Sequence, residues 1–314
     1  MAWAPDIAYD PAMNPEAGER YLAIVNPAAG AGRCGKRAPA AVERLRSGGL
    51  EVEVRRTAGP RDATRIGREG FAEGYRSFIV AGGDGSACEV VNGIVPPALQ
   101  AGEKVRLGFL PLGTGNAFLR SFATDRVGYS IESLLAGRRR PCDVLVLRHR
   151  EGEHYMINLF GFGMSVQTSI RSIKHKRWGV FGFVIAAVES MIVAPTAPLP
   201  LRLDGGELLD GPVGMICISN SQYAAQMLMA PDADIADGLL DLIRVEPIGR
   251  LEMMRTFPKL LKGTHLEHPR ISAAQGREIV FEVDEEVDVM ADGEVMRVLP
   301  WKIDVLQEVL EVCL

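Results

Sequence analysis

The chain has 314 residues, a formal net charge of −5 at pH 7 and a hydrophobic content of 47%. This length suits two domains, although one large domain is compatible with it, and the apolar content is ample for a real core. The negative charge argues against a nucleic-acid-binding protein, because contacts with a phosphate backbone need concentrated positive charge.

The cysteines and the N-terminal segment indicate the compartment. The five cysteines are dispersed and lack Cys-x-x-Cys spacing, so we expect small buried side chains in a reducing compartment, without disulfides or a zinc site. Residues 1–20 have no basic start and no apolar run, which predicts a lead-in segment and no signal peptide. The most apolar segment, 178–194, is shorter than the ~20 residues that span a bilayer. We therefore expect a cytoplasmic location.

Residues 21–142 alternate between predicted strands and predicted helices. Strands are expected at 21–25, 50–55, 78–81 and 105–110, and helices at 36–47, 61–73 and from Ala117. The run 78–81 has no polar alternation, which is typical of a strand buried on both faces of a parallel sheet. This alternation predicts an α/β domain with a parallel sheet.

After Arg138-Arg139-Arg140 the pattern becomes mainly β. Two helices are expected, at about 178–193 and 249–262, together with strands at 143–148, 153–158, 200–203, 213–219, 239–245, 278–283, 288–291 and 295–299. Turn signals such as Asp237-Gly238 and Asp292-Gly293 separate several of these strands. The second half is therefore predicted to be a mainly antiparallel β domain with inserted helices.

The most informative motif is Gly82-Gly83-Asp84-Gly85-Ser86, which directly follows a predicted strand. Without Cβ atoms, the glycines let a ligand approach the backbone. Ser86 and Glu89 have capping-box spacing, which predicts a helix that starts here and presents its N–H groups to an anion. Asp84 could face phosphate only through a metal or water, so the motif indicates nucleotide phosphate plus magnesium. The alternative is an ordinary strand-to-helix turn.

A second motif of the same kind, Pro111-Leu112-Gly113-Thr114-Gly115-Asn116, follows the strand at 105–110. Glycine-rich turns at the carboxyl ends of neighbouring strands are where open α/β sheets bind ligands. A third glycine segment, 30–36, satisfies two patterns at once. Its P-loop reading fails because Arg37 stands where a magnesium-binding Ser or Thr is needed, and its dinucleotide reading is weakened by Asn26-Pro27-Ala28-Ala29. A flexible loop, or a loop over phosphates with Arg33, Lys36 or Arg37 nearby, remains open.

Two groups of carboxylates are candidates for chemistry. Asp292-Gly293-Glu294 lies between two alternating strands, where it is either a plain hairpin turn or a source of a general base for phosphoryl transfer. Asp232, Asp234, Asp237 and Asp241 form an acidic cluster that lacks the ligand spacing of an EF-hand. It is either a surface loop or a looser Mg²⁺ site.

The segment Lys174-His175-Lys176-Arg177 precedes the apolar run 178–188. Basic residues beside such a run suit transient docking on an anionic membrane surface, and a buried helix with a solvated basic start is equally compatible. His265-x-x-His268 lacks the Glu and the spacing of a zinc protease, and we expect it at the surface.

Taken together, the ordered motifs resemble the diacylglycerol kinase catalytic-domain superfamily, which includes bacterial soluble lipid kinases and sphingosine kinases. The matching residues span 22–300: Asn26-Pro27-x-x-Gly30, Thr57, Asp62-Ala63, the two glycine turns, Glu89-Val90-Val91-Asn92-Gly93, Asp143, Asn158, Pro231-Asp232-Ala233, Asp237-Gly238-Leu239-Leu240 and Asp292-Gly293-Glu294. The resemblance implies an α/β + β protein: an N-terminal α/β nucleotide-binding domain, 21–142 with 304–314 returning to it, and a C-terminal mainly antiparallel β-sandwich domain, 143–303, that holds a lipid.

The resemblance also implies a function and a set of site residues. ATP and Mg²⁺ would be needed to phosphorylate a lipid alcohol, with ATP in a cleft between the domains. Asp292 or Glu294 would be the general base, and Asp84, Asp234, Asp237 and Leu239 would serve magnesium. Positions expected at the nucleotide are Asn26, Thr57, Gly82, Gly83, Asp84, Gly85, Ser86, Ala87, Cys88, Glu89, Gly113, Thr114 and Asn116.

The sequence departs from the family pattern at three positions. Ser86 replaces the commoner Thr, Cys88 replaces a usual Asn, and Ala117 stands where many bacterial members carry Asp. Three questions stay open at this point: whether the enzyme is instead a kinase of the NAD kinase type, whether the chain is a non-catalytic lipid- or nucleotide-binding module or a dinucleotide oxidoreductase built on 30–35, and whether it forms a homodimer.

Overall fold

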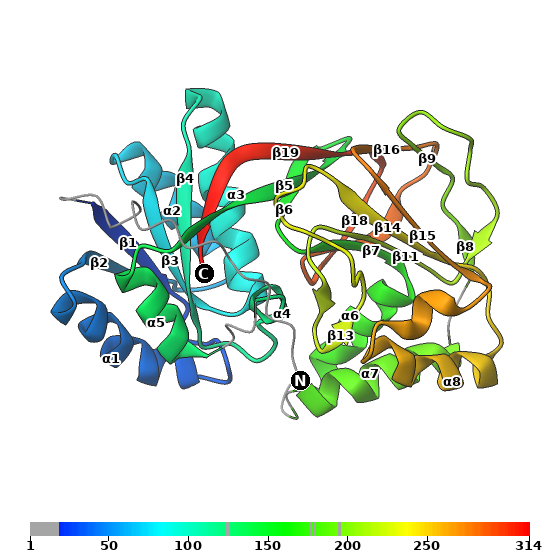
Figure 1. The fold of residues 1–314 in the computed structure, drawn as a ribbon, viewed down its shortest axis with the longest axis horizontal. Helices are drawn as coiled ribbons and strands as arrows, with labels where there is room; N and C mark the ends of the chain where they lie inside the picture. The colour runs from blue at the N-terminus through cyan, green and yellow to red at the C-terminus, as the bar shows by residue number, and fades with distance from the viewer. Residues whose placement is uncertain (1–18, 123–125, 176–177, 179, 194–195) are drawn as a thin grey trace. The chain divides into compact units, whose positions relative to one another are not determined.

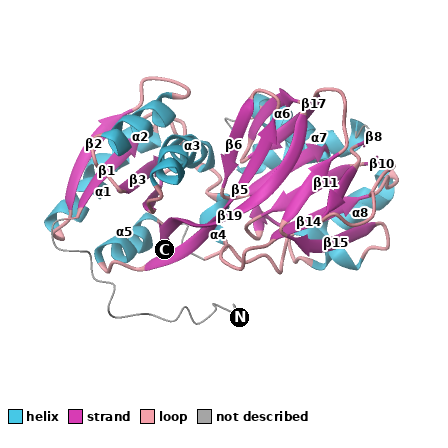
Figure 2. Ribbon diagram, turned by 90° about the horizontal axis from the view of Figure 1, so that it is seen from above, coloured by secondary structure: helices cyan, strands magenta, loops and turns pink. Residues whose placement is uncertain are grey.

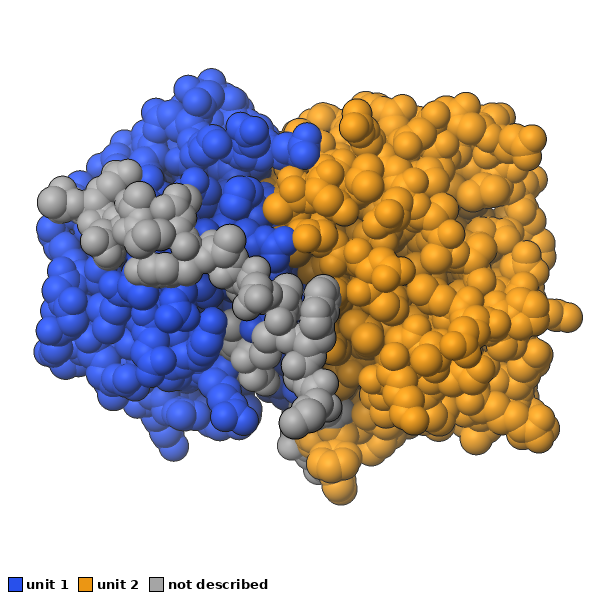
Figure 3. All heavy atoms as spheres, viewed as in Figure 1, with its two compact units in different colours: residues 1–142, 307–314 blue, residues 143–306 orange. Residues whose placement is uncertain are grey.

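The computed structural model describes residues 19–122, 126–175, 178, 180–193 and 196–314. The chain divides into two compact units, residues 1–142 with 307–314, and residues 143–306 (Figure 3). The predicted lead-in segment lies outside the described residues except for Glu19 and Arg20. Each unit is described by itself below.

Unit 1 is built on a parallel sheet with the strand order β2-β1-β3-β4-β19 (Figure 1). Its strands are β1 (Arg20–Val25), β2 (Glu51–Arg56), β3 (Ser77–Gly82), β4 (Val105–Pro111) and the end of β19 (Pro300–Cys313). All six residues of β3 are buried, as the unbroken apolar run predicted. The last residues of β19, Leu310–Cys313, pair with β4.

Helices cover both faces of this sheet (Figure 2). α1 (Arg33–Ser47) and α5 (Val127–Leu135) pack on the face that Tyr21, Ala23 and Val25 present. α2 (Asp62–Ala72) and α3 (Asp84–Ala101) pack on the other face, where a Cβ on Gly70 would stand 2.4 Å from the Leu22 side chain. The alternation of side chains along β1 therefore separates the two cores of the unit. A short helix, α4 (Ala117–Arg120), follows β4.

Buried charges hold the start of the described chain to this sheet. The Glu19 carboxylate accepts hydrogen bonds from Ser77, Arg106 and Arg139, and the Arg139 side chain is only 7% exposed. The Arg106 Nε also pairs with Glu311 of β19, at 3.2 Å. A buried ion pair is costly to break from one side, so this network fixes the strands it joins.

Unit 2 is a sandwich of two β layers with helices on the outer face of one layer. The antiparallel layer has the order β15-β14-β11-β7-β17-β18, and the second layer contains β5, β6, β16, β9 and the first part of β19. The six strands of the first layer are β7 (Leu159–Gly163), β11 (Met215–Ser219), β14 (Leu240–Val245), β15 (Ile271–Gly276), β17 (Val287–Ala291) and β18 (Glu294–Val298). The second layer, besides β19, has β5 (Arg139–His149), β6 (Gly152–Met156), β9 (Leu201–Leu203) and β16 (Glu278–Phe281).

Alternation along the strands of unit 2 fills two separate cores. Ile216 and Ile218 of β11 point into the sandwich core, while Met215 and Cys217 point to the helical side. Across the sandwich, the Phe160 and Phe281 rings lie 5.6 Å apart between centroids. α6 (Met164–Lys174), α7 (Val180–Val193) and α8 (Arg250–Leu260) cover the other side of β7, β11 and β14 (Figure 1). Short elements complete the unit: β8 (Ala197–Pro198), β10 (Pro212–Val213), β12 (Tyr223–Ala224), β13 (Met227–Leu228) and the 3₁₀ helix Thr264–Glu267.

The α/β and antiparallel β-sandwich architectures are confirmed, and several element boundaries were wrong. The helix predicted from position 36 begins at Arg33, and the strands at 159–163 and 271–276 and the helix at 164–174 were not predicted. β7 was missed because two of its five residues are glycines, which weaken a strand pattern. Gly161 is nevertheless needed there, since a Cβ on it would lie 2.6 Å from the Ser165 Cβ of α6.

Candidate functional site

The two glycine turns of unit 1 lie against each other. β3 and β4 are parallel neighbours, and Gly82 pairs with Pro111 where both strands end. A Cβ built on Gly113 would stand 2.4 Å from the Gly83 Cα, and a Cβ on Gly83 would stand 3.2 Å from the Gly113 Cα. Only two glycines allow this approach of one backbone to the other. The structure confirms that the two turns share one edge of the sheet.

Asp84 joins the first turn to the second. Its carboxylate accepts hydrogen bonds from the backbone N–H groups of Asn116, Ala117 and Phe118, the last at 3.4 Å. A Cβ on Gly115 would lie 2.8 Å from the Asp84 Oδ2. Burial raises the pKa of the Asp84 carboxyl, and the N–H donors oppose that shift. The contact makes Asp84 a structural link between the turns in addition to any role toward a metal.

A third segment, the loop after β1, reaches the same edge. The Asn26 Nδ2 donates to the Ser86 Oγ at 2.9 Å, and its Oδ1 accepts from the Ala28 N–H at 3.1 Å. Gly30 has φ +60°, and a Cβ there would stand 2.4 Å from the Leu112 carbonyl oxygen. Three segments far apart in sequence therefore converge where β1, β3 and β4 end.

The predicted capping box at this helix was wrong. α3 begins at Asp84, two residues before Ser86, with Gly83 at the N-cap and no side-chain cap. The Ser86 hydroxyl instead accepts from Asn26, and the Glu89 Oε2 accepts from the Ala63 N–H of α2 at 3.1 Å. The helix starts directly at the turn, and the Ser86 and Ala87 N–H groups both donate to the Gly83 carbonyl, so these two donors are already used.

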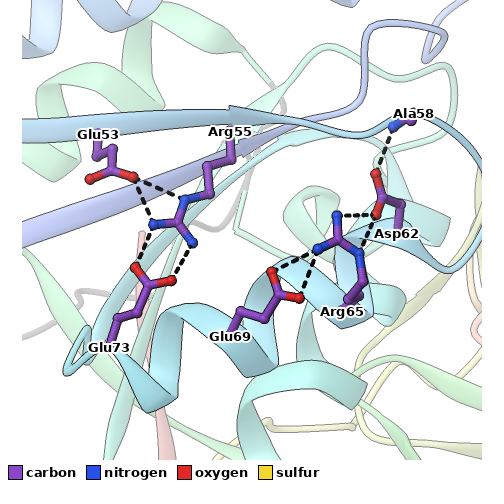
Figure 4. A network of polar contacts seen from close by, with 7 residues as sticks. All are labelled: Glu53, Arg55, Ala58, Asp62, Arg65, Glu69 and Glu73. Atoms are coloured by element: carbon purple, nitrogen blue, oxygen red, sulfur yellow. Dashed lines mark hydrogen bonds and ion pairs between the residues drawn. The ribbon is translucent and has the colours of Figure 1, made fainter.

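Thr57, which follows β2, belongs to a loop held in place by charges. Its N–H donates to the Val25 carbonyl at 2.9 Å, which sets it beside the end of β1. The Asp62 Oδ2 accepts from the Ala58 N–H at 2.7 Å, and Arg65 bridges Asp62 to Glu69 (Figure 4). The hydrogen bond from the Ala58 N–H is the main cause that lowers the pKa of the Asp62 carboxyl, and the hydrogen bond from Arg65 is the second. A neighbouring network joins Arg55 to Glu53 and Glu73 (Figure 4).

The structure separates the remaining nucleotide candidates by exposure. Thr114 is exposed at the tip of the second turn, and Gly85 has open space where a Cβ would stand. Cys88 is buried in α3, and the Glu89 carboxylate accepts a hydrogen bond from the Ala63 N–H of α2. Ala87 lines a small cavity of about 20 Å³ together with Gly82, Gly83 and Asn116.

In unit 2, the two carboxylates at the β17–β18 turn have different surroundings. Asp292 has φ +45° and is 5% exposed, and its oxygens accept hydrogen bonds from the N–H groups of Ile157, Asn158 and Leu159 at 2.9, 3.0 and 2.8 Å. It fixes the turn to the loop between β6 and β7. Glu294 is exposed. The first carboxylate therefore positions the turn, and the second faces solvent.

The acidic cluster of unit 2 offers oxygen ligands. Asp234 and Asp237 are exposed and accept the Ala236 and Leu239 N–H groups through their Oδ1 atoms, at 3.0 and 2.9 Å. Asp241 is buried, and burial, followed by the charges of Asp237 and Asp232, raises its pKa to about 6. Carboxylates that repel one another suit a hard divalent cation, which would relieve that repulsion. The residues present thus fit Mg²⁺.

Between the six-stranded sheet and α6–α8, unit 2 holds two adjoining cavities of about 60 and 40 Å³, which we call the methionine-lined cavity. Both are bounded by Met164, Met191, Met215, Phe257 and Leu260, and no charged residue lines the larger one. The sequence did not predict this cavity, because its lining residues are scattered between 159 and 290. Flexible methionine side chains adapt to apolar ligands of varied shape.

One expectation near this cavity was wrong. His265 is 1% exposed and not at the surface, and it lines the smaller part of the cavity. Its Nε2 lies 3.0 Å from the Met229 carbonyl, while its Nδ1 is buried without a hydrogen bond. Burial lowers the pKa of His265. The His268 side chain is also largely covered: it is 10% exposed, and its Nε2 lies 3.0 Å from the Glu252 Oε1.

The chain resembles known proteins along both units. The diacylglycerol kinase catalytic domain model matches residues 20–147, and the YegS C-terminal NAD kinase β-sandwich-like domain model matches residues 159–314. A diacylglycerol kinase of Mycobacterium tuberculosis is 28% identical over 301 residues, which cover 93% of this chain and 94% of that protein. A diacylglycerol kinase of Bacillus subtilis is 26% identical over 288 residues, or 90% and 92% of the two chains.

Solved structures show the same fold. One from Bacillus anthracis superposes with a TM-score of 0.77 at 24% identity, covering 94% of this chain and 97% of the other. A diacylglycerol kinase from the same organism gives a TM-score of 0.70 at 21% identity, with 94% and 96% covered. The two matched models together account for both units, so the chain is a kinase and belongs to the diacylglycerol kinase catalytic-domain superfamily.

Proposed function

We propose that this enzyme transfers the γ-phosphate of ATP, with Mg²⁺, to the hydroxyl group of a lipid alcohol of the diacylglycerol or sphingoid type. The observation that carries the lipid assignment is the methionine-lined cavity of unit 2, whose larger part is bounded by apolar side chains apart from Ser165, Thr168 and Ser169. A polar acceptor such as NAD would leave its own hydrogen-bonding groups unpaired there.

We assign the binding of the nucleotide to unit 1. The turns 82–86 and 111–116 expose backbone at an edge reached by Asn26 and Thr57, and the N-terminus of α3 opens at Gly83. Backbone N–H groups at a helix start attract phosphate oxygens through unsatisfied donors and the helix dipole. Thr114 and the Gly85 backbone are accessible for this purpose, while Asp84 holds the two turns in register.

Mg²⁺ would be held by the carboxylates of Asp234 and Asp237 with the Leu239 carbonyl, and Asp84 would face the nucleotide-associated ion through water. When bound, the nucleotide-associated Mg²⁺ would supply positive charge to phosphate oxygens on which negative charge develops during transfer. The chain's own contribution is to hold Asp234 and Asp237 through the Ala236 and Leu239 N–H groups, which orients the acidic loop before any ion binds.

Glu294 is assigned as the general base. An exposed carboxylate on a short, fixed turn can take the proton of a lipid hydroxyl as that oxygen attacks the γ-phosphate. Asp292 is assigned a positioning role, because three backbone N–H donors already occupy its oxygens. All five cysteines are buried thiols, which supports the proposed cytoplasmic location.

The proposal is tested by incubating the enzyme with γ-labelled ATP, Mg²⁺ and a panel of lipid alcohols of increasing chain length. Label should enter the lipid phase, and turnover should rise with chain length up to the limit that the cavity accepts. Omission of Mg²⁺ is the control for metal dependence. Absence of labelled lipid across the panel would overturn the assignment.

A second candidate is a kinase that phosphorylates NAD, since the model matched at 159–314 is described as NAD kinase-like in its β-sandwich. This alternative leaves the methionine-lined cavity without a ligand. Incubation of the enzyme with the same labelled ATP and with NAD as the acceptor distinguishes the two candidate functions. We expect no phosphorylated dinucleotide.

A further inference from the structure

His265 carries a buried nitrogen that the protein itself leaves unpaired. The residue lies in the 3₁₀ helix Thr264–Glu267, is 1% exposed and bounds the smaller part of the methionine-lined cavity. Its Nδ1 has no hydrogen-bond partner among the described residues. Buried polar atoms are nearly always paired, so an unpaired nitrogen on a ring that borders a cavity points to a partner that enters the cavity.

The other ring nitrogen determines which kind of partner Nδ1 needs. The His265 Nε2 lies 3.0 Å from the Met229 carbonyl oxygen, which can only accept a hydrogen bond, so Nε2 carries the proton. Burial lowers the pKa of His265, so the ring is neutral near pH 7. In this tautomer Nδ1 is an acceptor. Its partner must therefore bring an O–H or N–H group, and the oxygens of an ester cannot serve.

The second polar side chain at this end of the cavity is also an acceptor. Thr256 of α8 is 8% exposed and bounds the smaller part, and its hydroxyl donates to the Glu252 carbonyl at 2.9 Å. The Thr256 oxygen keeps lone pairs that can accept a hydrogen bond. The other described side chains that bound this part are apolar. This end of the cavity thus favours a ligand with a donor group.

Strand register gives the depth of this end. Ser219 of β11 pairs with Leu159, whose N–H holds Asp292, so these strand ends lie beside the β17–β18 turn. Met215, four residues back along β11, pairs with Val245, and both bound the smaller part of the cavity. At ~3.4 Å per residue, the smaller part lies ~13 Å along the strand from the turn. A zigzag alkyl chain spans that distance with roughly ten carbon–carbon bonds of ~1.5 Å.

We propose that the smaller part of the methionine-lined cavity is a subsite for a hydroxyl group in the middle of a lipid chain. The chain hydroxyl donates to the His265 Nδ1, and Thr256 bounds the same part as a further acceptor. The inference rests on the proposed function, because the depth is counted from the turn that carries Glu294. It narrows the substrate class to lipid alcohols with a second hydroxyl roughly ten or more bonds from the phosphorylated one. An N–H beside the headgroup of a sphingoid lipid would lie too near the turn.

A chain without this hydroxyl should bind less well. The smaller part, of about 40 Å³, has room for a water molecule that could donate to Nδ1. A plain chain would displace such a water and leave Nδ1 unpaired, whereas a chain hydroxyl would replace its hydrogen bond. Sites built to bond a substrate hydroxyl discriminate against the analogue that lacks it. We therefore expect a preference of about tenfold or more in kcat/KM.

The test uses acylglycerols in detergent micelles that share one eighteen-carbon acyl chain. The chain carries a hydroxyl at carbon 6, 8 or 10, at carbon 2, or nowhere, and γ-labelled ATP reports turnover. An interior hydroxyl should raise kcat/KM about tenfold or more over the plain chain, while a hydroxyl at carbon 2, close to the headgroup, should not. Equal kcat/KM for interior and plain chains would overturn the subsite.

Variants assign the preference to Nδ1. His265→Phe removes the acceptor and should reduce the preference for the interior hydroxyl to about one, and His265→Asn, whose side-chain oxygen can accept in place of Nδ1, should restore part of it. His268→Gln is the matched control, at the residue that follows the same 3₁₀ helix and pairs with Glu252, and should keep the wild-type preference. An undiminished preference in His265→Phe would overturn the role of His265.

A binding measurement without ATP distinguishes failure of this inference from failure of the proposed function. Methyl esters of the plain and the 8-hydroxylated eighteen-carbon acid compete with a fluorescent fatty-acid probe for the wild-type protein. The hydroxylated ester should bind about tenfold tighter to the wild type and equally well to His265→Phe. Equal binding of the two esters by the wild type would refute the subsite and leave the kinase assignment intact. A tenfold difference in an enzyme that labels no lipid would support the subsite and contradict the lipid kinase.

Discussion

Gly113 lies so close to Gly83 that a Cβ on it would stand 2.4 Å from the Gly83 Cα. The two turns are thus packed backbone against backbone, and the register of β3 with β4 brings both to one edge of the sheet. The proposed phosphate site depends on this contact, because displacement of either turn would move its N–H groups.

Gly113→Ala should therefore weaken nucleotide binding and lower the free energy of unfolding by about 2 kcal/mol, as an added methyl group must push two backbones apart. Calorimetric titration with ATP and chemical denaturation measure both effects. Gly128→Ala is the matched control, since a Cβ there meets no atom within 4 Å. Wild-type ATP affinity in Gly113→Ala would refute the role of this contact.

Glu294→Gln and Asp292→Asn should fail in different ways. Loss of the base should reduce kcat by roughly 10²–10⁴-fold while Tm stays at the wild-type value, because Glu294 is exposed. Asp292→Asn should destabilise unit 2 by about 2 kcal/mol, since an amide cannot accept from all three N–H donors. Thermal unfolding and single-turnover kinetics on both variants separate the roles. Full turnover in Glu294→Gln would remove it as the base.

The methionine-lined cavity should be sensitive to filling. Ala187→Phe places a benzyl group in its larger part, so KM for a long-chain lipid alcohol should rise at least tenfold while the Kd for ATP is unchanged. Ile185→Phe, on the exposed side of the same helix, is the control for helix α7 itself. Equal KM values in the two variants would show that the lipid binds elsewhere.

Mg²⁺ should stabilise the protein through the acidic loop. Binding to the folded state alone raises Tm by mass action, so millimolar Mg²⁺ should increase the Tm of the wild type, and Asp237→Asn should lose most of that increase. Asp210→Asn, in an exposed loop of the same unit, is a suitable control. An undiminished Mg²⁺ response in Asp237→Asn would exclude this loop as the metal site.

His265 should make stability depend on pH. Burial lowers its pKa in the folded protein below the ordinary value of about 6.5. As the pH falls, the unfolded chain therefore binds a proton at His265 before the folded protein does. The stability that the neutral, buried His265 contributes is complete above about pH 6.5 and is lost as the pH falls toward the lower pKa of the folded protein. His265→Phe should flatten this part of the stability profile, and His268→Gln should not. An unchanged profile in His265→Phe would show that another group is responsible.

The sequence predicted the sheet of unit 1 well because its signals are local. The apolar run before Gly82, and the glycines themselves, encode a buried strand and a tight turn without help from distant residues. The capping box failed for the opposite reason: Asn26, sixty positions before Ser86, provides the hydroxyl's partner instead. Local spacing cannot reveal a competitor supplied by tertiary structure.

The methionine-lined cavity and the different surroundings of the two hairpin carboxylates depend on distant contacts. The N–H groups that hold Asp292 come from 157–159, more than 130 residues earlier. The cavity arises where Met164, Met215 and Met290, each unremarkable in its own segment, meet between a sheet and three helices. The motif Asp292-Gly293-Glu294 predicted the hairpin turn between β17 and β18 but not which acid faces outward.

The most direct measurement presents diacylglycerol and NAD together to the enzyme with Mg²⁺ and ATP labelled in the γ-phosphate, and identifies every labelled product by mass. We expect a single phosphorylated lipid, unlabelled dinucleotide, and loss of the lipid product in Glu294→Gln. Label on the dinucleotide, or on neither acceptor while ATP binds, would contradict a lipid kinase.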